Sequence, residues 1–367
     1  MKLVNSERKI KKPLVWLEIS KKNLRYNVAQ MRSLVGPSQI MAIVKANAYG
    51  AGALGVARVI EKSVDAFGVV GITEAMALRE GGIAKPIVQL GIYCPEDSEK
   101  FIKNQISPTV FTYTALRDFE RQCKKFKIKG ILWISVDTGL NRLAVPYQEA
   151  LQFIRKAFES KWLRIEGVFT TLTEDRAFDE TQLERFLAVK RACQKASITI
   201  PTWSLASSEG VFLFSEDCLD MVRIGISLLG YYPSKGAEAS KRVTLRPAVT
   251  FKTRVGCVQE LERGESIFYR RKFIAKQKTR IAVLLPGYSY GLDSRMALGG
   301  KVIIGGVHYP LVGGIGMTNC FADIGNNKKI KAGDEVEINI GEACALLQQD
   351  EYEFLSRIPE KVTRVYV

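Results

Sequence analysis

Short apolar runs alternate with amphipathic stretches from residue 15 to about residue 230, and this pattern limits the folds open to the chain. Apolar runs bounded by polar residues predict strands buried on both faces, and the amphipathic stretches predict helices between them. Eight such strands joined by helices predict an α/β fold, a closed (β/α)8 TIM-type barrel. The predicted strands are 15–19, 40–45, 66–70, 86–91, 109–112, 131–136, 165–170 and 202–205, and the predicted helices are 22–34, 53–62, 74–80, 113–126, 147–158 and 180–195.

The pattern changes after residue 234. Residues 235–242 are polar and predict a linker, and the runs beyond them read as strands separated by Gly-rich or charged turns. These predicted strands are 248–259, 281–285, 301–304, 310–312, 335–340 and 362–367. We therefore expect a barrel domain of residues 1–238 followed by a mostly β C-terminal domain of residues 239–367.

The composition is that of a globular protein, with 47% hydrophobic and 25% charged residues in 367. Apolar runs stay far below the roughly 18 residues of a membrane helix, and residues 1–12 are basic without a following apolar core. The seven scattered cysteines form no CxxC pair, so we expect reduced thiols in a cytoplasmic protein. A single histidine, His308, argues against zinc clusters and Ser-His triads, and no metal site is predicted.

The formal net charge of +16 raises the question of a nucleic-acid or membrane partner. The basic runs are spread along the chain instead of gathered in one tail; they lie at residues 21–22, 124–129, 270–272 and 328–331. We therefore favour a solvated surface that attracts anionic ligands, with a polyanion-binding face as the alternative and no nucleic acid expected.

The segment 41–50, MAIVKANAYG, runs from four apolar residues straight into Lys45. A lysine at the end of a buried strand is partly desolvated, which lowers its pKa and leaves an amine that can form a Schiff base with a carbonyl. Tyr49 follows on the adjoining turn, where its phenol could bind a phosphate. Taken alone, an apolar run ending in lysine is more often a core strand with a snorkelling side chain.

The segment 41–50 closely resembles the pyridoxal-phosphate lysine motif of bacterial alanine racemases. Residues 16–20 and 24–27, WLEIS and LRYN, resemble the opening of that family, and further motifs follow in matching order over essentially the full length. The resemblance implies pyridoxal 5'-phosphate as cofactor, Lys45 as its Schiff-base lysine and one of two catalytic bases, and Tyr49 as a ligand of its phosphate.

Two further segments of the predicted barrel carry the resemblance. VDTGLNR at 136–142 resembles the family's DTG-x-x-R segment, which implies that Arg142 contacts the cofactor and the substrate carboxylate. MVRIGI at 221–226 implies that Arg223 meets the pyridine nitrogen of the cofactor. The implied phosphate ligands are the backbone amides of Gly225 and Ile226 and the hydroxyls of Ser208 and Tyr352.

The C-terminal domain supplies the second base in this resemblance. LPGYSYG at 285–291 resembles the family's GYADG segment, which implies that Tyr288 is the base on the opposite face of the substrate. Nearby cations must favour its phenolate, because the reference pKa of tyrosine is about 10. Met317 is retained in the segment that resembles GRxCMD, and we assign it to substrate binding. In the family this tyrosine comes from the partner subunit, so a homodimer is implied.

Several positions depart from the family pattern. Ala51 replaces the histidine after Tyr-Gly, Thr171 replaces a histidine beside the cofactor ring, and Ser135 stands where many members have a carbamylated lysine. Gly314 and Thr318 replace the arginine and aspartate of GRxCMD. The two bases and the pyridine arginine are kept.

The sequence therefore predicts a two-base racemase that interconverts L- and D-alanine and supplies D-alanine for peptidoglycan. Alternatives are a racemase of another amino acid such as serine, or a racemase-like protein that binds the cofactor or a polyanion without turnover. A decarboxylase of the same architecture is disfavoured, because those enzymes pair the pyridine nitrogen with an acidic residue and this chain has Arg223.

Overall fold

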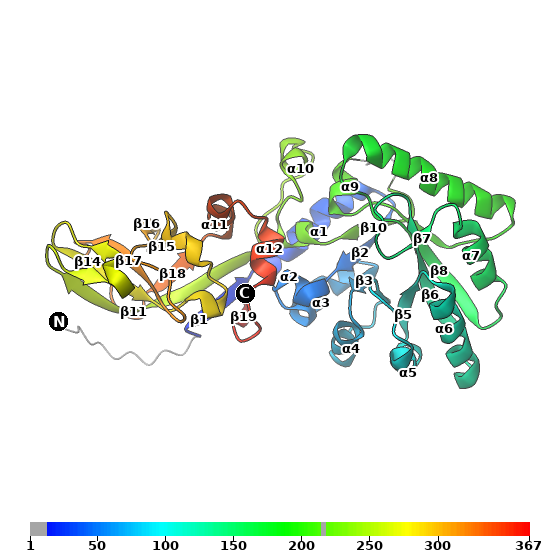
Figure 1. The fold of residues 1–367 in the computed structure, drawn as a ribbon, viewed down its shortest axis with the longest axis horizontal. Helices are drawn as coiled ribbons and strands as arrows, with labels where there is room; N and C mark the ends of the chain where they lie inside the picture. The colour runs from blue at the N-terminus through cyan, green and yellow to red at the C-terminus, as the bar shows by residue number, and fades with distance from the viewer. Residues whose placement is uncertain (1–12, 214–217) are drawn as a thin grey trace. The chain divides into compact units, whose positions relative to one another are not determined.

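The computed structural model of the protein describes residues 13–213 and 218–367, which form two compact units (Figure 1). Among the described residues, the barrel unit comprises 22–48, 52–213 and 218–247, and the β unit comprises 13–21, 49–51 and 248–367. The basic segment 1–12 lies outside the described residues. Within the described residues, no helix has both the length and the apolar character needed to cross a bilayer.

Eight parallel strands form the barrel and confirm the predicted fold class. In sheet order they are β10 (Met221–Ile224), β2 (Gln39–Ile43), β3 (Ala66–Val69), β4 (Ile87–Gln89), β5 (Ile106–Val110), β6 (Gly130–Asp137), β8 (Leu163–Phe169) and β9 (Thr202–Ser204). The short β7 (Val145–Pro146) pairs with β6. Irregular backbone bonds join β9 to β10: Asp220 N donates to Trp203 O at 3.0 Å and Arg223 N to Ala206 O at 2.9 Å. The barrel is therefore nearly closed.

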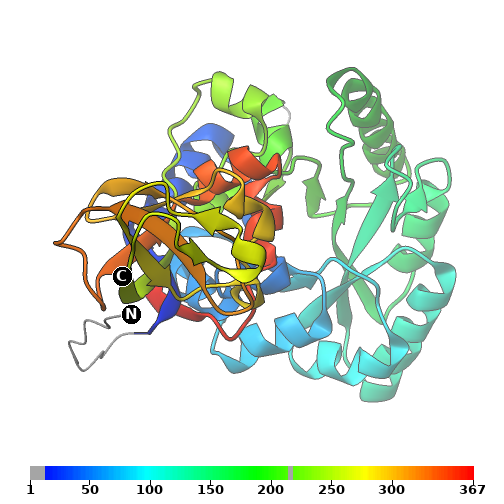
Figure 2. The ribbon, with the colours of Figure 1, turned by 60° about the vertical axis from the view of Figure 1, so that its left-hand side comes forward.

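Helices cover the outer side of these strands (Figures 1 and 2). Helix α6 shows why: Leu116, Phe119 and Cys123 lie on one face and are buried, while the Thr112 side chain caps the first turn by accepting from Ala115 N at 3.1 Å. The helices are α1 (Lys21–Val35), α3 (Ala53–Ile60), α4 (Ile72–Glu80), α5 (Ser98–Lys103), α6 (Tyr113–Phe126), α7 (Ala150–Phe158), α8 (Arg176–Lys195), α9 (Ser208–Leu213) and α10 (Lys235–Ala239), with the 3₁₀ turns η1 (Glu61–Ser63), η2 (Pro95–Asp97) and η3 (Ile226–Leu229).

The β unit is built on an eight-stranded sheet. Its order is β16 (Val307–Pro310), β15 (Lys301–Ile304), β18 (Glu335–Ile338), β11 (Val249–Leu261), β1 (Val15–Ile19) and β19 (Thr363–Tyr366), and β14 (Thr279–Leu284) joins β11 to β17 (Cys320–Gly325). Side chains of β11 alternate between buried and more exposed, as expected for a half-buried strand. The unit also contains β12 (Ser266–Ile267), β13 (Phe273–Ile274), η4 (Tyr269–Arg271), η5 (Tyr288–Tyr290), η6 (Ser294–Ala297), α11 (Ile340–Leu347) and α12 (Glu351–Ser356).

One predicted barrel strand was assigned to the wrong unit. Strand β1 pairs antiparallel with β11 and parallel with β19 in the β unit, and β10 is the eighth barrel strand in its place. The partners of β1 lie more than 200 residues away in the chain. An apolar run of five residues therefore predicts a strand but not the strands with which it pairs.

Other differences from the predicted elements are local. The strand predicted at 40–45 ends at Ile43, the strand predicted at 310–312 is β16 at Val307–Pro310, and helix α10 occupies most of the predicted linker 235–242. Strand β17 and helices α5, α9, α11 and α12 were not predicted. The position of the domain boundary after residue 238 stays a prediction.

Gly230 ends the turn η3 in the left-handed region, at φ 89°, and a Cβ there would lie 1.8 Å from the carbonyl oxygen of Arg246. We predict that Gly230→Ala lowers the unfolding free energy of the barrel unit by about 3 kcal/mol or more, because both strain and a backbone overlap arise. Gly82→Ala is the control: φ is 87° there with no atom within 4 Å, so it should cost only about 1 kcal/mol. Urea unfolding followed by circular dichroism measures the unfolding free energy of both variants. Equal losses of free energy would contradict a backbone overlap at position 230.

Candidate active site

Lys45 begins a left-handed turn directly after strand β2. Residues 46–49 have φ of 50°, 55°, 52° and 52°, although none of them is glycine. Each such residue costs about 1–2 kcal/mol, so surrounding bonds must hold the turn. Ala48 N donates to Val44 O and Gly52 N to Asn47 O, both at 2.8 Å, and the Asn47 side chain accepts from Ala53 N at 2.8 Å. The direction in which Lys45 leaves the barrel strand is thereby fixed.

The Lys45 amine lies in a cationic surrounding. Burial lowers the pKa of Lys45, the charges of Arg142 and Arg223 lower it further, and Glu74 opposes them. A larger fraction of this lysine is therefore a neutral amine than of an ordinary surface lysine, and a neutral amine can attack a carbonyl or accept a proton. The structure brings these three predicted site residues of the barrel unit together.

The guanidinium of Arg223, on β10, is buried and donates four hydrogen bonds. Nη1 donates to the backbone oxygen of Ser204 at 3.0 Å and to its Oγ at 2.7 Å, while Nη2 donates to Thr170 O at 2.6 Å and Leu205 O at 3.2 Å. Its carbon lies 5.0 Å from the centre of the Phe169 ring. Burial, with a smaller contribution from Arg142, lowers the pKa of Arg223 to about 10, so the side chain stays charged at neutral pH.

Four of the five N–H groups of Arg223 are thus used, and the fifth, on Nε, has no acceptor among the described residues. This one donor is available to a ligand. Ser204 and Thr170, which orient the guanidinium, were not identified from the sequence; their places at the ends of β9 and β8 are the signal that could have found them.

Arg142 lies on the loop that follows β6, and Asp137 shapes that loop. The two carboxylate oxygens of Asp137 accept from three backbone N–H groups, those of Gly139 at 2.8 Å, Asn141 at 3.1 Å and Arg142 at 3.0 Å. The Asp-Thr-Gly motif therefore builds a turn that presents Arg142. The arginine itself is exposed to solvent.

Ser208, Gly225 and Ile226 are neighbours in the barrel unit. Gly225 N donates to Ser208 Oγ at 3.0 Å, which leaves the serine proton free to bind an anion. Ile226 begins the 3₁₀ turn η3, whose first N–H groups have no partner within the turn. Ser227 Oγ, in the same turn, is buried without a hydrogen-bond partner in the described chain. Convergent N–H and O–H groups of this kind suit a phosphate.

The remaining predicted residues belong to the β unit. Tyr288 N donates to Gly316 O at 2.9 Å and Ser289 N to Met317 O at 3.0 Å, so the segments of Tyr288 and Met317 lie side by side, with both side chains at least half exposed. Tyr352 donates from its hydroxyl to Asp350 at 2.7 Å. Burial raises the pKa of Tyr49, and Tyr352 raises it further, so the Tyr49 phenol keeps its proton and can donate to an anion.

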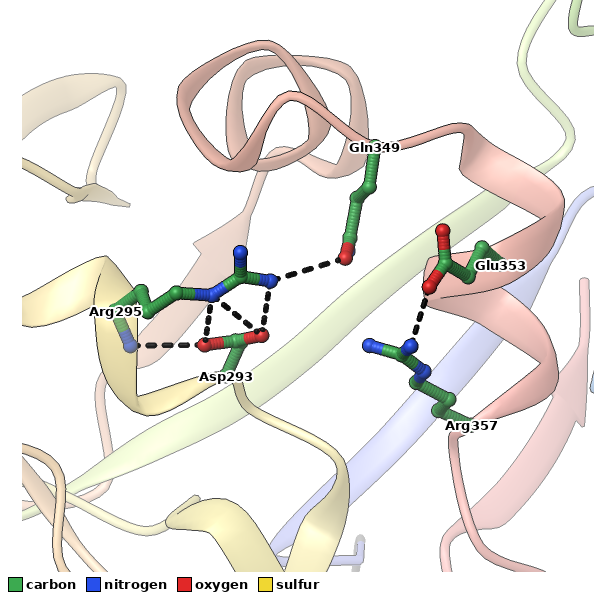
Figure 3. A network of polar contacts seen from close by, with 5 residues as sticks. All are labelled: Asp293, Arg295, Gln349, Glu353 and Arg357. Atoms are coloured by element: carbon green, nitrogen blue, oxygen red, sulfur yellow. Dashed lines mark hydrogen bonds and ion pairs between the residues drawn. The ribbon is translucent and has the colours of Figure 1, made fainter.

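A pocket of about 340 Å³ lies beside Tyr288 in the β unit. Its charged lining residues are Asp293 and Arg357. Arg295 forms a bidentate ion pair with Asp293 and a hydrogen bond with Gln349, and Glu353 forms an ion pair with Arg357 (Figure 3). The Arg295 guanidinium holds the pKa of Asp293 below its usual range.

Tyr269 was not considered from the sequence but stands out in the structure. It lies on η4 with 78% of its surface exposed, next to Arg270 and Arg271, and it is flanked by left-handed backbone at Phe268 (φ 73°) and Arg270 (φ 57°). Strain at non-glycine residues often marks a functional position. Its exposure and strained surroundings make Tyr269 a second candidate for a tyrosine base.

The structure explains one of the departures from the family pattern. A Cβ at Gly314 would lie 2.4 Å from Cε1 of Phe268, so the Phe268 ring occupies the space that an arginine side chain at 314 would need. Ala51, the position of a missing histidine, accepts a hydrogen bond on its backbone oxygen from the Tyr366 hydroxyl at 2.8 Å. Nothing in the structure explains the change at Thr318.

The chain matches two family models, "Alanine racemase, N-terminal domain" over residues 19–233 and "Alanine racemase, C-terminal domain" over residues 248–366. It is 32% identical to the alanine racemase of Desulforamulus reducens, over 96% of this chain and 99% of the relative. Among solved structures, the alanine racemase of Clostridium difficile 630 aligns with a TM-score of 0.92 at 30% identity, over 97% of this chain and 96% of that one. The fold is also that of the alanine racemase of Bartonella henselae with covalently bound pyridoxal phosphate (TM-score 0.85, 24% identity, 97% and 100% covered).

The electrostatics of Lys45 predict its reactivity in the full-length cofactor-free chain. Because the pKa of Lys45 is lowered, its labelling by a small amine reagent should reach half-maximum below the ordinary lysine value of about 10.4. Lys278 is the internal control, since its hydrogen bond and ion pair with Glu262 raise its pKa. Mass spectrometry after pulse labelling across pH measures both lysines, and a Lys45 midpoint at or above that of Lys278 would refute the assignment.

Proposed function

The chain belongs to the alanine racemase family, and from that premise we propose that it interconverts L- and D-alanine with pyridoxal 5'-phosphate as cofactor. The observation that carries the proposal is the grouping of Lys45, Arg142 and Arg223 in the barrel unit, where a partly neutral amine lies among cations. An aldehyde that carries a phosphate and a phenolic oxygen is the kind of ligand that such a group attracts. Both matched family models, which together cover most of the chain, support it.

The residues present fit this cofactor. Lys45 would bond its aldehyde carbon, and the free N–H on Nε of Arg223 would donate to its ring nitrogen. The hydroxyl of Ser208, held by the amide of Gly225, and the amide of Ile226 would bind its phosphate. The hydroxyls of Tyr49 and of Tyr352, the latter on release of Asp350, are further proposed ligands. The unpartnered Ser227 Oγ beside this turn agrees with a polar ligand there.

When bound, pyridoxal phosphate would supply an electron-withdrawing ring that makes the Cα hydrogen of the substrate more acidic. Arg223 limits that withdrawal, because an arginine can donate a hydrogen bond to the ring nitrogen but cannot give it a proton at neutral pH. An acidic residue at this position would strengthen the withdrawal, as a decarboxylase requires. The four bonds that fix the guanidinium would hold Nε in place for this hydrogen bond.

Inversion at Cα needs a base on each face of the substrate. We assign one face to Lys45 Nζ, whose lowered pKa lets it accept a proton and then return it. Arg142 would bind the substrate carboxylate, with Met317 as a further substrate contact. On the opposite face we propose Tyr288, from the resemblance, with Tyr269 as the competing residue because of its strained, cation-flanked position.

We propose that the second subunit of a homodimer supplies this tyrosine. Supply of D-alanine for peptidoglycan and a cytoplasmic location are likewise proposed, the latter supported by seven free cysteines in the described chain. Serine in place of alanine is the second candidate substrate, favoured by the small, uncharged Thr318 where the family pattern has an aspartate. A protein that binds the cofactor without turnover is the remaining alternative.

The test of the function combines an absorbance spectrum with incubation of L-alanine in heavy water. We expect a visible band from the cofactor bound to Lys45, loss of optical rotation, and deuterium at Cα. Lys45→Ala should remove the band and lower the rate by about 10³-fold or more, because a base and the point of attachment are lost together. Lys85→Ala, outside the proposed site, is the control. A band without inversion of alanine or serine would favour the binding protein.

The two tyrosines are separated by Tyr288→Phe and Tyr269→Phe. The variant that removes the base on the opposite face should keep the visible band and lower the racemisation rate by about 10²–10⁴-fold, the usual contribution of a general base. Exchange of the Cα hydrogen of the enantiomer served by Lys45 should persist in that variant while inversion stops. Polarimetry and deuterium incorporation, measured together, decide between them, and full inversion in both variants would exclude a tyrosine base at either position.

A further inference from the structure

Glu74, in the first turn of α4, connects two segments of the barrel unit. Its Oε2 accepts from the backbone N–H groups of Val70 at 3.0 Å and Gly71 at 3.2 Å. Its Oε1 accepts from Asn47 N at 3.3 Å, in the turn that follows Lys45. One carboxylate thus links the end of β3 to the left-handed turn at 46–49.

That turn needs support from outside. Its local bonds join residues of the segment 44–53 to each other, and for residues 46–48 the described chain shows one hydrogen bond from beyond that segment, the one to Glu74. Four successive non-glycine residues in the left-handed region cost several kcal/mol in sum, at about 1–2 kcal/mol each. Glu74 binds the residue at the middle of this strain, Asn47 (φ 55°).

Glu74 also places a negative charge near the Lys45 amine. The charged groups of the barrel unit that act on this amine are Arg142 and Arg223, which favour its neutral form, and Glu74, which favours its protonated form. A residue that only shaped the backbone would not need the charge, because an amide oxygen also accepts from N–H groups.

Resting on the proposed function, we propose that Glu74 is a positioning residue of the racemase site. Its carboxylate holds the turn that aims Lys45 through the bond from Asn47 N, and its negative charge opposes the two arginines, so that Lys45 can accept a proton from Cα. The same carboxylate therefore couples the backbone and the proton balance of the site.

Three variants separate the two roles. Glu74→Gln keeps an acceptor oxygen and removes the charge, while Glu74→Asp keeps the charge and shortens the reach to Asn47. Glu61→Gln is the matched control, because Glu61 Oε1 likewise accepts from two backbone N–H groups, of Ala84 at 2.7 Å and Lys85 at 3.3 Å, in the same unit. The first readout is pulse labelling of Lys45 across pH in the full-length cofactor-free chain, which does not require activity.

In Glu74→Gln the labelling midpoint of Lys45 should move to lower pH by about half a unit or more, because an opposite charge near the amine is lost. Glu74→Asp should keep the midpoint of the unchanged protein but lower racemisation about tenfold or more through misplacement of Lys45. Glu61→Gln should change neither. A Glu74→Gln midpoint that coincides with that of the unchanged protein overturns the proposal, as does full activity in both Glu74 variants.

The second readout, the rate of alanine racemisation against pH, distinguishes a failure of this inference from a failure of the function. A shifted labelling midpoint in a protein that never racemises alanine supports the role of Glu74 at Lys45 and refutes the racemase. Normal racemisation with an unshifted midpoint refutes the role of Glu74 alone.

Discussion

The buried guanidinium of Arg223 is the interaction on which the barrel and its site both depend. Burial of a charge is unfavourable unless hydrogen bonds compensate for it, and here four acceptors at the ends of β8 and β9 do so. The same bonds tie β10 to β9, where the regular sheet pairing is interrupted. These bonds therefore support barrel closure, together with the backbone bonds between β9 and β10, and also orient the N–H group that has no acceptor among the described residues.

The balance of charge around Lys45 is the second constraint. Burial, Arg142 and Arg223 lower its pKa, and Glu74 raises it. Asp137 orients the Arg142 loop by accepting from three of its backbone N–H groups.

Much of the fold could be predicted because its signals are local. Strand β15 and helix α6 were placed with the correct bounds, since alternating or amphipathic patterns depend on each residue and its near neighbours. Strand β1 was assigned to the wrong unit, because pairing with β11 and β19 depends on segments far away in the chain. The left-handed turn at 46–49 had no signal either, because alanine, asparagine and tyrosine are all compatible with a right-handed helix.

By itself, the sequence determined the fold class and the family and predicted residues for the proposed chemistry, because hydrophobic periodicity and short motifs are properties of neighbouring residues. Only the tertiary structure decided which donor of Arg223 stays free, that Glu74 binds the turn beside Lys45, and that Phe268 fills the space at Gly314. These contacts join residues far apart in the chain. Their geometry is set by how the strands pack, and no single segment of the sequence encodes it.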